Sequence, residues 1–298
     1  MLNINSSKHL PARVLTPSLD GTNELDFSSK PNLDISRKVL EKFSHVAQSA
    51  VKASAKLFLK DFGKAKNIQI KNNDFGNLVS RADKNIETQI RKIIGKNFPT
   101  HKIIGEEFSK DKVKPTDLVW IIDPIDGTTN YIQGLPFACI SLGLWQGNTP
   151  LVGVVLNPIT EQLWTAVKGQ GAFLNQQKLH VSKKHGLNFT YGGFGWGRNV
   201  KKAQINFPKL LPILHKVRTL GSATLEMCLV AQGVYDFYLQ NEINIWDFAA
   251  SALLVLEAGG EITEINGQPL TASTTNFLCS NGHIHQHMLK EFKKAVLI

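Results

Sequence analysis

The sequence predicts an α+β (α/β layered) fold in which layers of helices cover β-sheets. Three features of the 298 residues indicate this class: two amphipathic helical segments near the N-terminus, a series of short apolar strands in the middle, and strands alternating with helices in the C-terminal part. The chain shows no internal repeat and no low-complexity linker, and its 42% apolar residues are enough for a large core. One large domain, or two closely joined ones, is therefore expected.

The N-terminal part is predicted to contain an extension and two helices. Residues 1–31 are polar, rich in Ser, Asn and Thr, and without a usable apolar period, so we expect a disordered extension. From Asp34 to Gly63, apolar residues recur at helical spacing, which predicts a long amphipathic helix closed by the glycine. A second helix is predicted from Ala82 to Asn97, because four isoleucines fall on one of its faces.

Strands dominate the middle of the chain. HKIIGEE (101–107) and DLVWIID (117–123) predict two short buried strands that both end in acidic residues. The segment 139–167 predicts a meander with turns at Gly147-Asn148 and Asn157-Pro158. After this, strands and helices are expected to alternate. The expected strands lie near 189–194, 237–239 and 261–265, and the expected helices lie near 222–232, near 246–258 and from about His283 onwards.

Composition argues against several classes of protein. No apolar stretch reaches about 18 residues and no signal-peptide pattern begins the sequence, so neither a membrane span nor secretion is supported. Cys139, Cys228 and Cys279 lie far apart in apolar contexts, which predicts buried thiols in a reducing compartment. The net charge of +10 comes from scattered lysines without a long like-charge run, so nucleic-acid binding is not expected. A cytoplasmic enzyme is the expectation.

Acidic residues stand at the ends of several predicted elements. They are Asp83, Glu106, Glu107, Asp123, Asp126 and Asp247. An Asp-Pro-x-Asp-Gly segment alone is typical of a turn. Asp83 and Asp247 stand where a negative charge favours a helix N-terminus, an effect of roughly 0.3–1 kcal/mol that needs no ligand. A functional interpretation requires these acids to converge in space.

Convergence would make bound cations necessary. Two like charges about 4 Å apart cost on the order of 4 kcal/mol at an effective dielectric near 20, so several such pairs cannot all stay ionised alone. Only oxygen ligands stand near these motifs, which favours Mg²⁺, Mn²⁺ or Ca²⁺ over zinc. Because Mg²⁺ binds phosphates by preference, and Gly127-Thr128-Thr129 offers backbone N–H groups at the start of a helix, we expect the site to bind a phosphate.

These motifs resemble the inositol monophosphatase family of magnesium-dependent, lithium-sensitive sugar phosphatases. IIGEE, WIIDPIDGTTNY and WDFAASALLVLEAGG occur in this order and are together highly specific. The resemblance covers residues 32–298 and implies a five-layer αβαβα sugar-phosphatase fold, usually in a homodimer. It also implies an N-terminal part that binds metal and phosphate, residues 32–185, and a C-terminal part on the substrate side, residues 186–298.

The resemblance also implies roles for the matching residues. The expected metal ligands are Glu106, Asp123 and the carbonyl of Ile125 for a first ion, and Asp123, Asp126 and Asp247 for a second. Asp83, Glu106 and Thr128 match the catalytic residues of the family, and of these Asp83 and Thr128 match the ones that orient and deprotonate the attacking water. A third, looser Mg²⁺ is expected near Glu106. Two or three Mg²⁺ per site are therefore expected, with Mn²⁺ as an alternative.

Substrate contacts follow from the same resemblance. The expected phosphate-binding residues are Gly127, Thr128 and Thr129, and the expected substrate-binding residues are Asp126, Gly221, Ser222, Ala223, Gln240 and Asp247. Gln240 departs from the family, in which many members carry a glutamate at this place. Its carbonyl can accept a hydrogen bond but cannot neutralise a cation, which counts against the ammonium of histidinol phosphate.

The predicted function is magnesium-dependent hydrolysis of inositol monophosphate or a related polyol or sugar phosphate by an activated water. Histidinol phosphate, sugar bisphosphates, nucleotides and NADP are alternative substrates of the same fold. A non-catalytic role in binding RNA or a protein is the alternative from another class. The histidines of HIHQH (283–287) are interpreted as surface residues rather than as a metal site.

Overall fold

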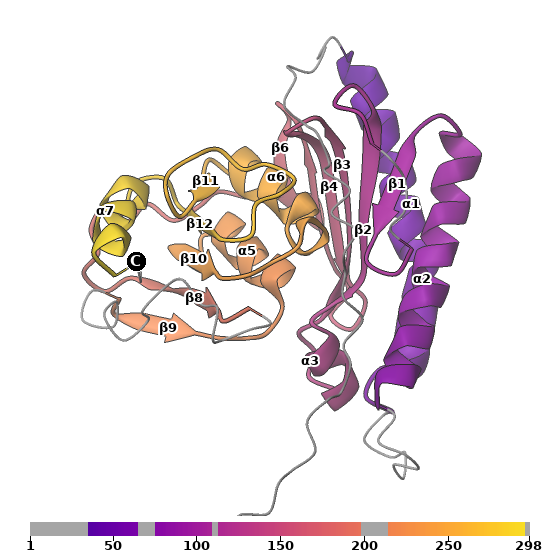
Figure 1. Cartoon of the computed structure of the whole chain (residues 1–298), viewed down its shortest axis with the longest axis horizontal. Coiled ribbons are helices and arrows are strands. Elements are labelled where there is room, and N and C mark those ends of the chain that lie inside the picture. The colour runs from indigo at the N-terminus through magenta and orange to yellow at the C-terminus, as the bar shows by residue number, and fades with distance from the viewer. Residues whose placement is uncertain (1–34, 65–74, 109–112, 198–213, 296–298) are drawn as a thin grey trace, which may run out of the picture.

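The computed structural model describes residues 35–64, 75–108, 113–197 and 214–295. The described elements stack in five layers, helices, sheet, helices, sheet and helix, as Figure 1 shows from right to left. The predicted αβαβα architecture is therefore confirmed. The extension expected at residues 1–31 lies outside the described residues. None of the described helices has both the length and the apolar character needed to cross a membrane.

The first layer consists of helices α1 (Arg37–Asp61) and α2 (Phe75–Asn97), which pack on each other and on one face of the first sheet. Gly63 follows α1 with φ +68°, and a Cβ there would lie 3.2 Å from the Cα of Gly134. The predicted closing glycine is thus explained by its backbone and its neighbour. The predicted start of α2 at Ala82 is wrong, because the helix begins seven residues earlier.

The first sheet has seven strands that follow one another in chain order. They are β1 (Lys102–Gly105), β2 (Leu118–Asp126), β3 (Cys139–Gln146), β4 (Thr149–Asn157), β5 (Gln162–Val167), β6 (Gly171–Leu174) and β7 (Gln177–Lys178). β1 and β2 pair in parallel, and the remaining pairs are antiparallel. The carboxyl ends of β1 and β2 therefore meet at one edge of the sheet. The ladder between β2 and β3 shifts register between Asp123 and Asp126.

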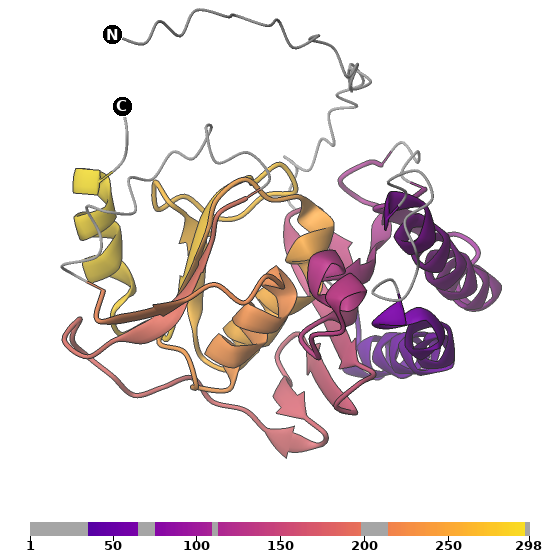
Figure 2. The same cartoon turned by 90° about the horizontal axis from the view of Figure 1, so that it is seen from below.

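The middle layer lies between the two sheets (Figure 2). It contains α5 (Ala223–Ala231), the short 3₁₀ helix η3 (Ile245–Asp247) and α6 (Ala249–Glu257). Most residues of α5 and α6 are buried on every side, as expected for helices covered by a sheet on both faces. Gly153 on β4 allows close contact, because a Cβ there would lie 2.2 Å from the carbonyl oxygen of Ala250.

The second sheet has five strands in the order β11-β12-β10-β8-β9. Their bounds are β8 (Tyr191–Gly195), β9 (Lys216–Arg218), β10 (Phe237–Gln240), β11 (Glu261–Glu264) and β12 (Phe277–Ser280). The outer layer is α7 (His285–Ala295), whose Met288, Leu289 and Phe292 are buried with the apolar side chains of this sheet. The sequence did not predict β6, β7, β9 or β12.

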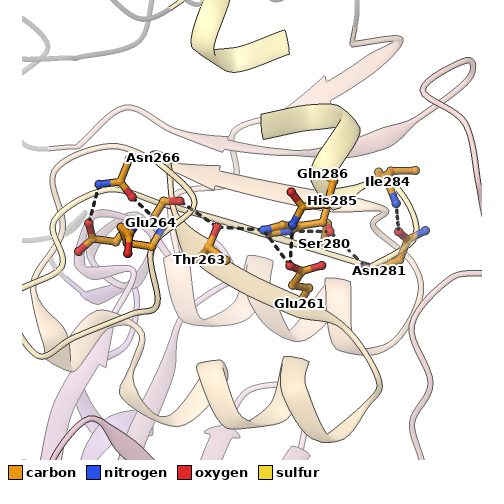
Figure 3. Close-up of polar contacts among 11 residues, drawn as sticks. Glu261, Thr263, Glu264, Asn266, Ser280, Asn281, Ile284, His285 and Gln286 are labelled. Carbon is orange, nitrogen blue, oxygen red and sulfur yellow. Dashed lines mark hydrogen bonds and ion pairs between the residues drawn. The ribbon is translucent and has the colours of Figure 1, made fainter. Parts of the chain in front are cut away.

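His285 joins α7 to the second sheet (Figure 3). Its side chain is fully buried, with Nδ1 2.9 Å from Ser280 Oγ and Nε2 2.9 Å from Thr263 Oγ1. The prediction that the histidines of 283–287 are surface residues is therefore wrong for His285, although His283 and His287 are exposed. The three cysteines are buried free thiols, as predicted.

Candidate active site

Three acidic side chains from two distant parts of the chain converge beside the carboxyl end of β2. Asp123 and Asp126 lie on either side of the register shift in that strand, and Asp247 is the last residue of η3, which contacts β2. One carboxylate oxygen from each residue lies within 4.8 Å of the corresponding oxygens of the other two. Because all three are oxygen donors, this group has the composition of a site for a hard divalent cation.

Hydrogen bonds from the chain fix one oxygen of each carboxylate. Asp123 Oδ1 accepts the backbone N–H of Ile125 at 3.0 Å. Asp247 Oδ2 accepts the backbone N–H of Asn244 at 3.0 Å, within a capping box at η3. Asp126 Oδ2 accepts the backbone N–H of Thr224 at 3.0 Å and a short hydrogen bond from the hydroxyl of Ser222. The fold therefore holds three like charges in defined orientations.

The electrostatics of this group call for a cation. Burial, followed by the charges of Glu106, Asp126 and Asp247, raises the pKa of Asp123 well above its usual value. Burial and the charge of Asp247 raise the pKa of Asp126 to about 7. At 4.8 Å and an effective dielectric of about 20, each repulsive pair costs on the order of 3 kcal/mol. A divalent ion would replace this repulsion with attraction and keep the carboxylates ionised.

Asp83 lies on α2, within reach of the charge of Glu106. It lies inside α2, not at the start of the helix, so the predicted N-terminal position is wrong and helix capping does not explain it. Its side chain is only 4% exposed, and Oδ1 has no hydrogen-bond partner among the described residues. Burial, then Glu106 and Glu107, raise its pKa to about 8.

A tight turn links the acids of β2 to helix α3 (Thr128–Gln133). Gly127 has φ +82°, and a Cβ there would lie 2.9 Å from the carbonyl oxygen of Phe137, so this position requires glycine. Thr128 Oγ1 donates a hydrogen bond to the carbonyl oxygen of Ile125 at 3.0 Å. The turn thus has a fixed shape, and its residues face the same space as Asp126.

A cavity of about 380 Å³ opens in front of this turn. Nine residues that the sequence singled out contribute to its lining: Asp126, Gly127, Thr128, Thr129, Gly221, Ser222, Ala223, Gln240 and Asp247. Asp83, Glu106, Asp123 and Ile125 are not among the lining residues. The charges of Glu106 and Asp83 nevertheless act on Asp123, which places them around the same acidic group.

Gln240 lines the cavity, and its side-chain amide is held by neighbouring groups. The Tyr238 hydroxyl donates a short hydrogen bond to Gln240 Oε1, and Gln240 Nε2 donates to the carbonyl oxygen of Asn241 at 2.6 Å. These bonds fix the amide, and one lone pair of its carbonyl is already occupied before any substrate binds. Tyr238 was missed in the sequence, although the alternation of a strand places it on the same face as Gln240.

Glu226 is a second residue that sequence reasoning missed. It is 1% exposed, lines the cavity, and accepts at Oε1 the backbone N–H groups of Leu220 at 3.0 Å and Gly221 at 3.3 Å. Burial raises its pKa to about 8. It follows Ser222 by one helical turn, and this spacing was the only signal in the sequence. Glu226 therefore holds the backbone of residues 220–221 beside the cavity.

Comparison with known proteins identifies the family. The model of the inositol monophosphatase family matches residues 39–297. Inositol monophosphatase 2 of Solanum lycopersicum is 36% identical over 266 residues, covering 86% of this chain and all of that protein. Inositol-1-monophosphatase of a Synechocystis species is 37% identical over 254 residues, covering 84% of this chain and 88% of that protein.

A solved structure of similar fold agrees with these matches. Inositol monophosphatase from an Anabaena (Nostoc) species superposes with a TM-score of 0.77 at 31% identity, covering 86% of this chain and 97% of that one. The family match, the identities and the shared fold extend over nearly all of the described residues. The chain therefore belongs to the inositol monophosphatase family and is a phosphatase, a phosphoric monoester hydrolase.

Proposed function

We propose that this phosphatase hydrolyses inositol monophosphate, or a closely related polyol or sugar phosphate, with Mg²⁺ as its cofactor. The observation that carries the proposal is the convergence of Asp123, Asp126 and Asp247 beside a cavity that Thr128 and Thr129 also line. Carboxylates with raised pKa values favour a bound cation, and an all-oxygen donor set favours Mg²⁺ or Mn²⁺.

The proposed ligand set uses residues around the acidic group. Glu106, Asp123 and the carbonyl of Ile125 would hold one ion, and Asp126 and Asp247 would share a second with Asp123. When bound, such ions supply electrostatic stabilisation of the phosphoryl group and of the leaving oxygen. The hydrogen bonds at Asp123, Asp126 and Asp247 support this assignment, because each leaves the orientation of a carboxylate fixed in advance.

The chain's own groups would position the water and the phosphate. Asp83 has a buried oxygen with no hydrogen-bond partner among the described residues, which suits a base that accepts a proton from the attacking water once bound cations keep its carboxylate ionised. Thr128, fixed by its bond to Ile125, would orient that water. The backbone of Gly127, Thr128 and Thr129 would face the phosphate oxygens.

Charge counting favours three ions during turnover. Asp83, Glu106, Asp123, Asp126 and Asp247 bring five negative charges when ionised, and a phosphate monoester adds about two. Two divalent ions supply about four positive charges and three supply about six. We therefore propose that one ion enters with the substrate.

The size of the cavity bears on the choice of substrate. A cavity of about 380 Å³ accommodates a small phosphorylated ring. Histidinol phosphate, sugar bisphosphates, nucleotides and NADP stay as alternatives. The homodimer, the sensitivity to lithium and the cytoplasmic location also stay predictions, as does the division of the chain near residue 185. Sedimentation velocity measures the oligomeric state directly.

A phosphate-release panel tests the function. Inositol monophosphates, histidinol phosphate, fructose bisphosphate and a nucleotide are compared with Mg²⁺, with Mn²⁺, with chelator and with added lithium. We expect fastest release from an inositol monophosphate with Mg²⁺, and loss of release in Asp123→Asn. Asp117→Asn, just before the same strand, is the control, because Asn can still accept the Lys114 N–H that Asp117 accepts. Equal release with chelator, or full activity of Asp123→Asn, would contradict the proposal.

A further inference from the structure

We propose that Glu87 and Arg91 are positioning residues that set the location of Glu106 in the active site. This inference depends on the proposed function, in which Glu106 is a metal ligand. Glu87 and Arg91 lie on α2 and form an ion pair one helical turn apart, with Arg91 Nε 2.7 Å from Glu87 Oε1. The pair holds the backbone on both sides of Glu106.

Hydrogen bonds from the pair reach both sides of this segment. Arg91 Nη1 donates to the carbonyl oxygen of Ile103 in β1 at 3.1 Å, and Nη2 donates to the carbonyl oxygen of Phe108 at 3.0 Å. Glu87 Oε2 accepts the backbone N–H of Glu107 at 2.9 Å. The planar guanidinium therefore bonds to three acceptors at once, one on α2 and two on the segment that carries Glu106.

The strand end is shaped to fit this carboxylate. Glu87 is fully buried, and a Cβ built on Gly105 would lie 2.3 Å from Glu87 Oε1. Only glycine allows the backbone next to Glu106 to lie this close to the Glu87 side chain. A buried carboxylate in direct contact with the chain fixes its position more tightly than an exposed one, because neither partner can exchange with water.

Helix α2 carries the proposed base on the same face. Asp83, Glu87 and Arg91 follow one another at intervals of four residues, which places them in one row along the helix. The row thus connects the group that would accept a proton, Asp83, to the group that holds Glu106. Arg91 also offsets the negative charge of Glu87, which otherwise adds to the charges of Glu106 and Glu107 that act on Asp83.

A second ion pair in the chain has the same residue types and spacing as the Glu87–Arg91 pair but is exposed to solvent. Arg37 and Glu41 on α1 have the same residue types, the same four-residue spacing and an Nε–Oε1 distance of 2.9 Å. Their side chains are 78% and 41% exposed, against 23% for Arg91 and 0% for Glu87. Among the described residues, neither the Arg37 side chain nor the Glu41 side chain makes a hydrogen bond to the backbone. This pair is therefore a matched control.

The test measures metal affinity rather than stability alone. In the full-length protein, Arg91→Leu, Arg91→Lys and Glu87→Gln are compared with Arg37→Leu. The readouts are the Mg²⁺ concentration that gives half-maximal phosphate release, calorimetric binding of Mn²⁺ without substrate, and the thermal unfolding midpoint. We expect the Arg91 and Glu87 variants to need roughly 10–100-fold more Mg²⁺, the range typical for residues that orient ligands, and to recover most of their kcat at saturating Mg²⁺.

Arg91→Lys should show a smaller shift than Arg91→Leu, because an ammonium can keep one of the three bonds. Arg37→Leu should leave the Mg²⁺ midpoint and Mn²⁺ binding unchanged. If Arg91→Leu fails to fold, the lysine and glutamine variants carry the test. Folded variants with a lower unfolding midpoint but wild-type metal affinity would overturn the inference and leave the proposed function standing. A wild-type protein that binds no Mn²⁺ and releases no phosphate would overturn the proposed function itself.

Discussion

Acidification should weaken the attachment of α7 through His285. The imidazole is fully buried between α7, β11 and β12, and it is held at both nitrogens by the hydroxyls of Ser280 and Thr263 (Figure 3). Glu261 lies close to the ring, with Oε1 3.9 Å from Nε2, and it also accepts a hydrogen bond from Gln286. The neutral ring fits this site, because one hydroxyl can accept a hydrogen bond from the protonated nitrogen while the other hydroxyl donates to the unprotonated nitrogen.

The magnitude follows from the pKa of the ring. Burial lowers the pKa of His285 from 6.5 to about 4. The unfolded chain therefore binds a proton at a higher pH than the folded protein does. Stability is complete above about pH 6.5 and is lost as pH falls toward about 4, at a slope of about 1.4 kcal/mol per pH unit inside that window. The full loss is about 3 kcal/mol, which is a large part of a typical folding free energy.

Urea unfolding of metal-free protein between pH 7.5 and about 4 measures this effect, with His285→Gln as the test and His287→Gln as the matched control. His287 lies two residues away and is exposed. Carboxylates also titrate in this range, but they are common to all three proteins, so the difference from wild type isolates one imidazole. His285→Gln should be less stable at pH 7.5 and should lose less stability on acidification. Parallel pH curves for wild type and His285→Gln would refute the reasoning, as would an imidazole resonance of His285 that titrates near pH 6.5.

Three further predictions concern the active site. Asp247→Asn should lower kcat by roughly 100-fold or more while keeping the capping bond to the backbone, so circular dichroism should match wild type; retained turnover would remove Asp247 from the mechanism. Gly127→Ala should lose about 1–2 kcal/mol of stability from its φ of +82° alone, with further loss from the contact with Phe137, and thermal unfolding measures both. Glu226→Leu should raise KM more than it lowers kcat, because the N–H groups of Leu220 and Gly221 beside the cavity lose their acceptor, and Glu226→Gln should restore KM. Equal KM for the two Glu226 variants would contradict that role.

The acids were readable in the sequence, but their surroundings were not. Asp123 and Asp126 follow an apolar run directly, so a strand that ends in carboxylates could be predicted from local pattern. The sequence predicts Asp83 at a helix start because the isoleucines that indicate this helix begin only at Ile86. Its buried position depends on how α2 packs against β2, and that contact comes from tertiary packing that a local period does not contain.

The second sheet shows a similar limit. β12 is buried along its whole length, so its four residues lack the alternation that marks a half-exposed strand. β9 has three residues and β7 has two, which is too short for any period. His285 could have been identified, because Met288, Leu289 and Phe292 follow it at helical spacing on the buried face. The alternate histidines suggested a surface pattern instead.

Ser222 links the first sheet to the middle helix layer, so the geometry of the site depends on how these layers pack and not on any one sequence motif. Its hydroxyl donates to Asp126 at the end of β2 and accepts the backbone N–H of Leu225 at 3.2 Å, so it caps α5 with the same oxygen. Asn130 on α3 adds a second link, since its Nδ2 donates to the carbonyl oxygens of Phe137 at 2.8 Å and Leu220 at 2.7 Å. Both links join the end of the first sheet to the middle helix layer. The position of residues 220–223 relative to Asp126 is therefore set by how these layers pack. Because Asp247 also comes from the middle layer, a change in that packing would alter the acidic group together with the cavity.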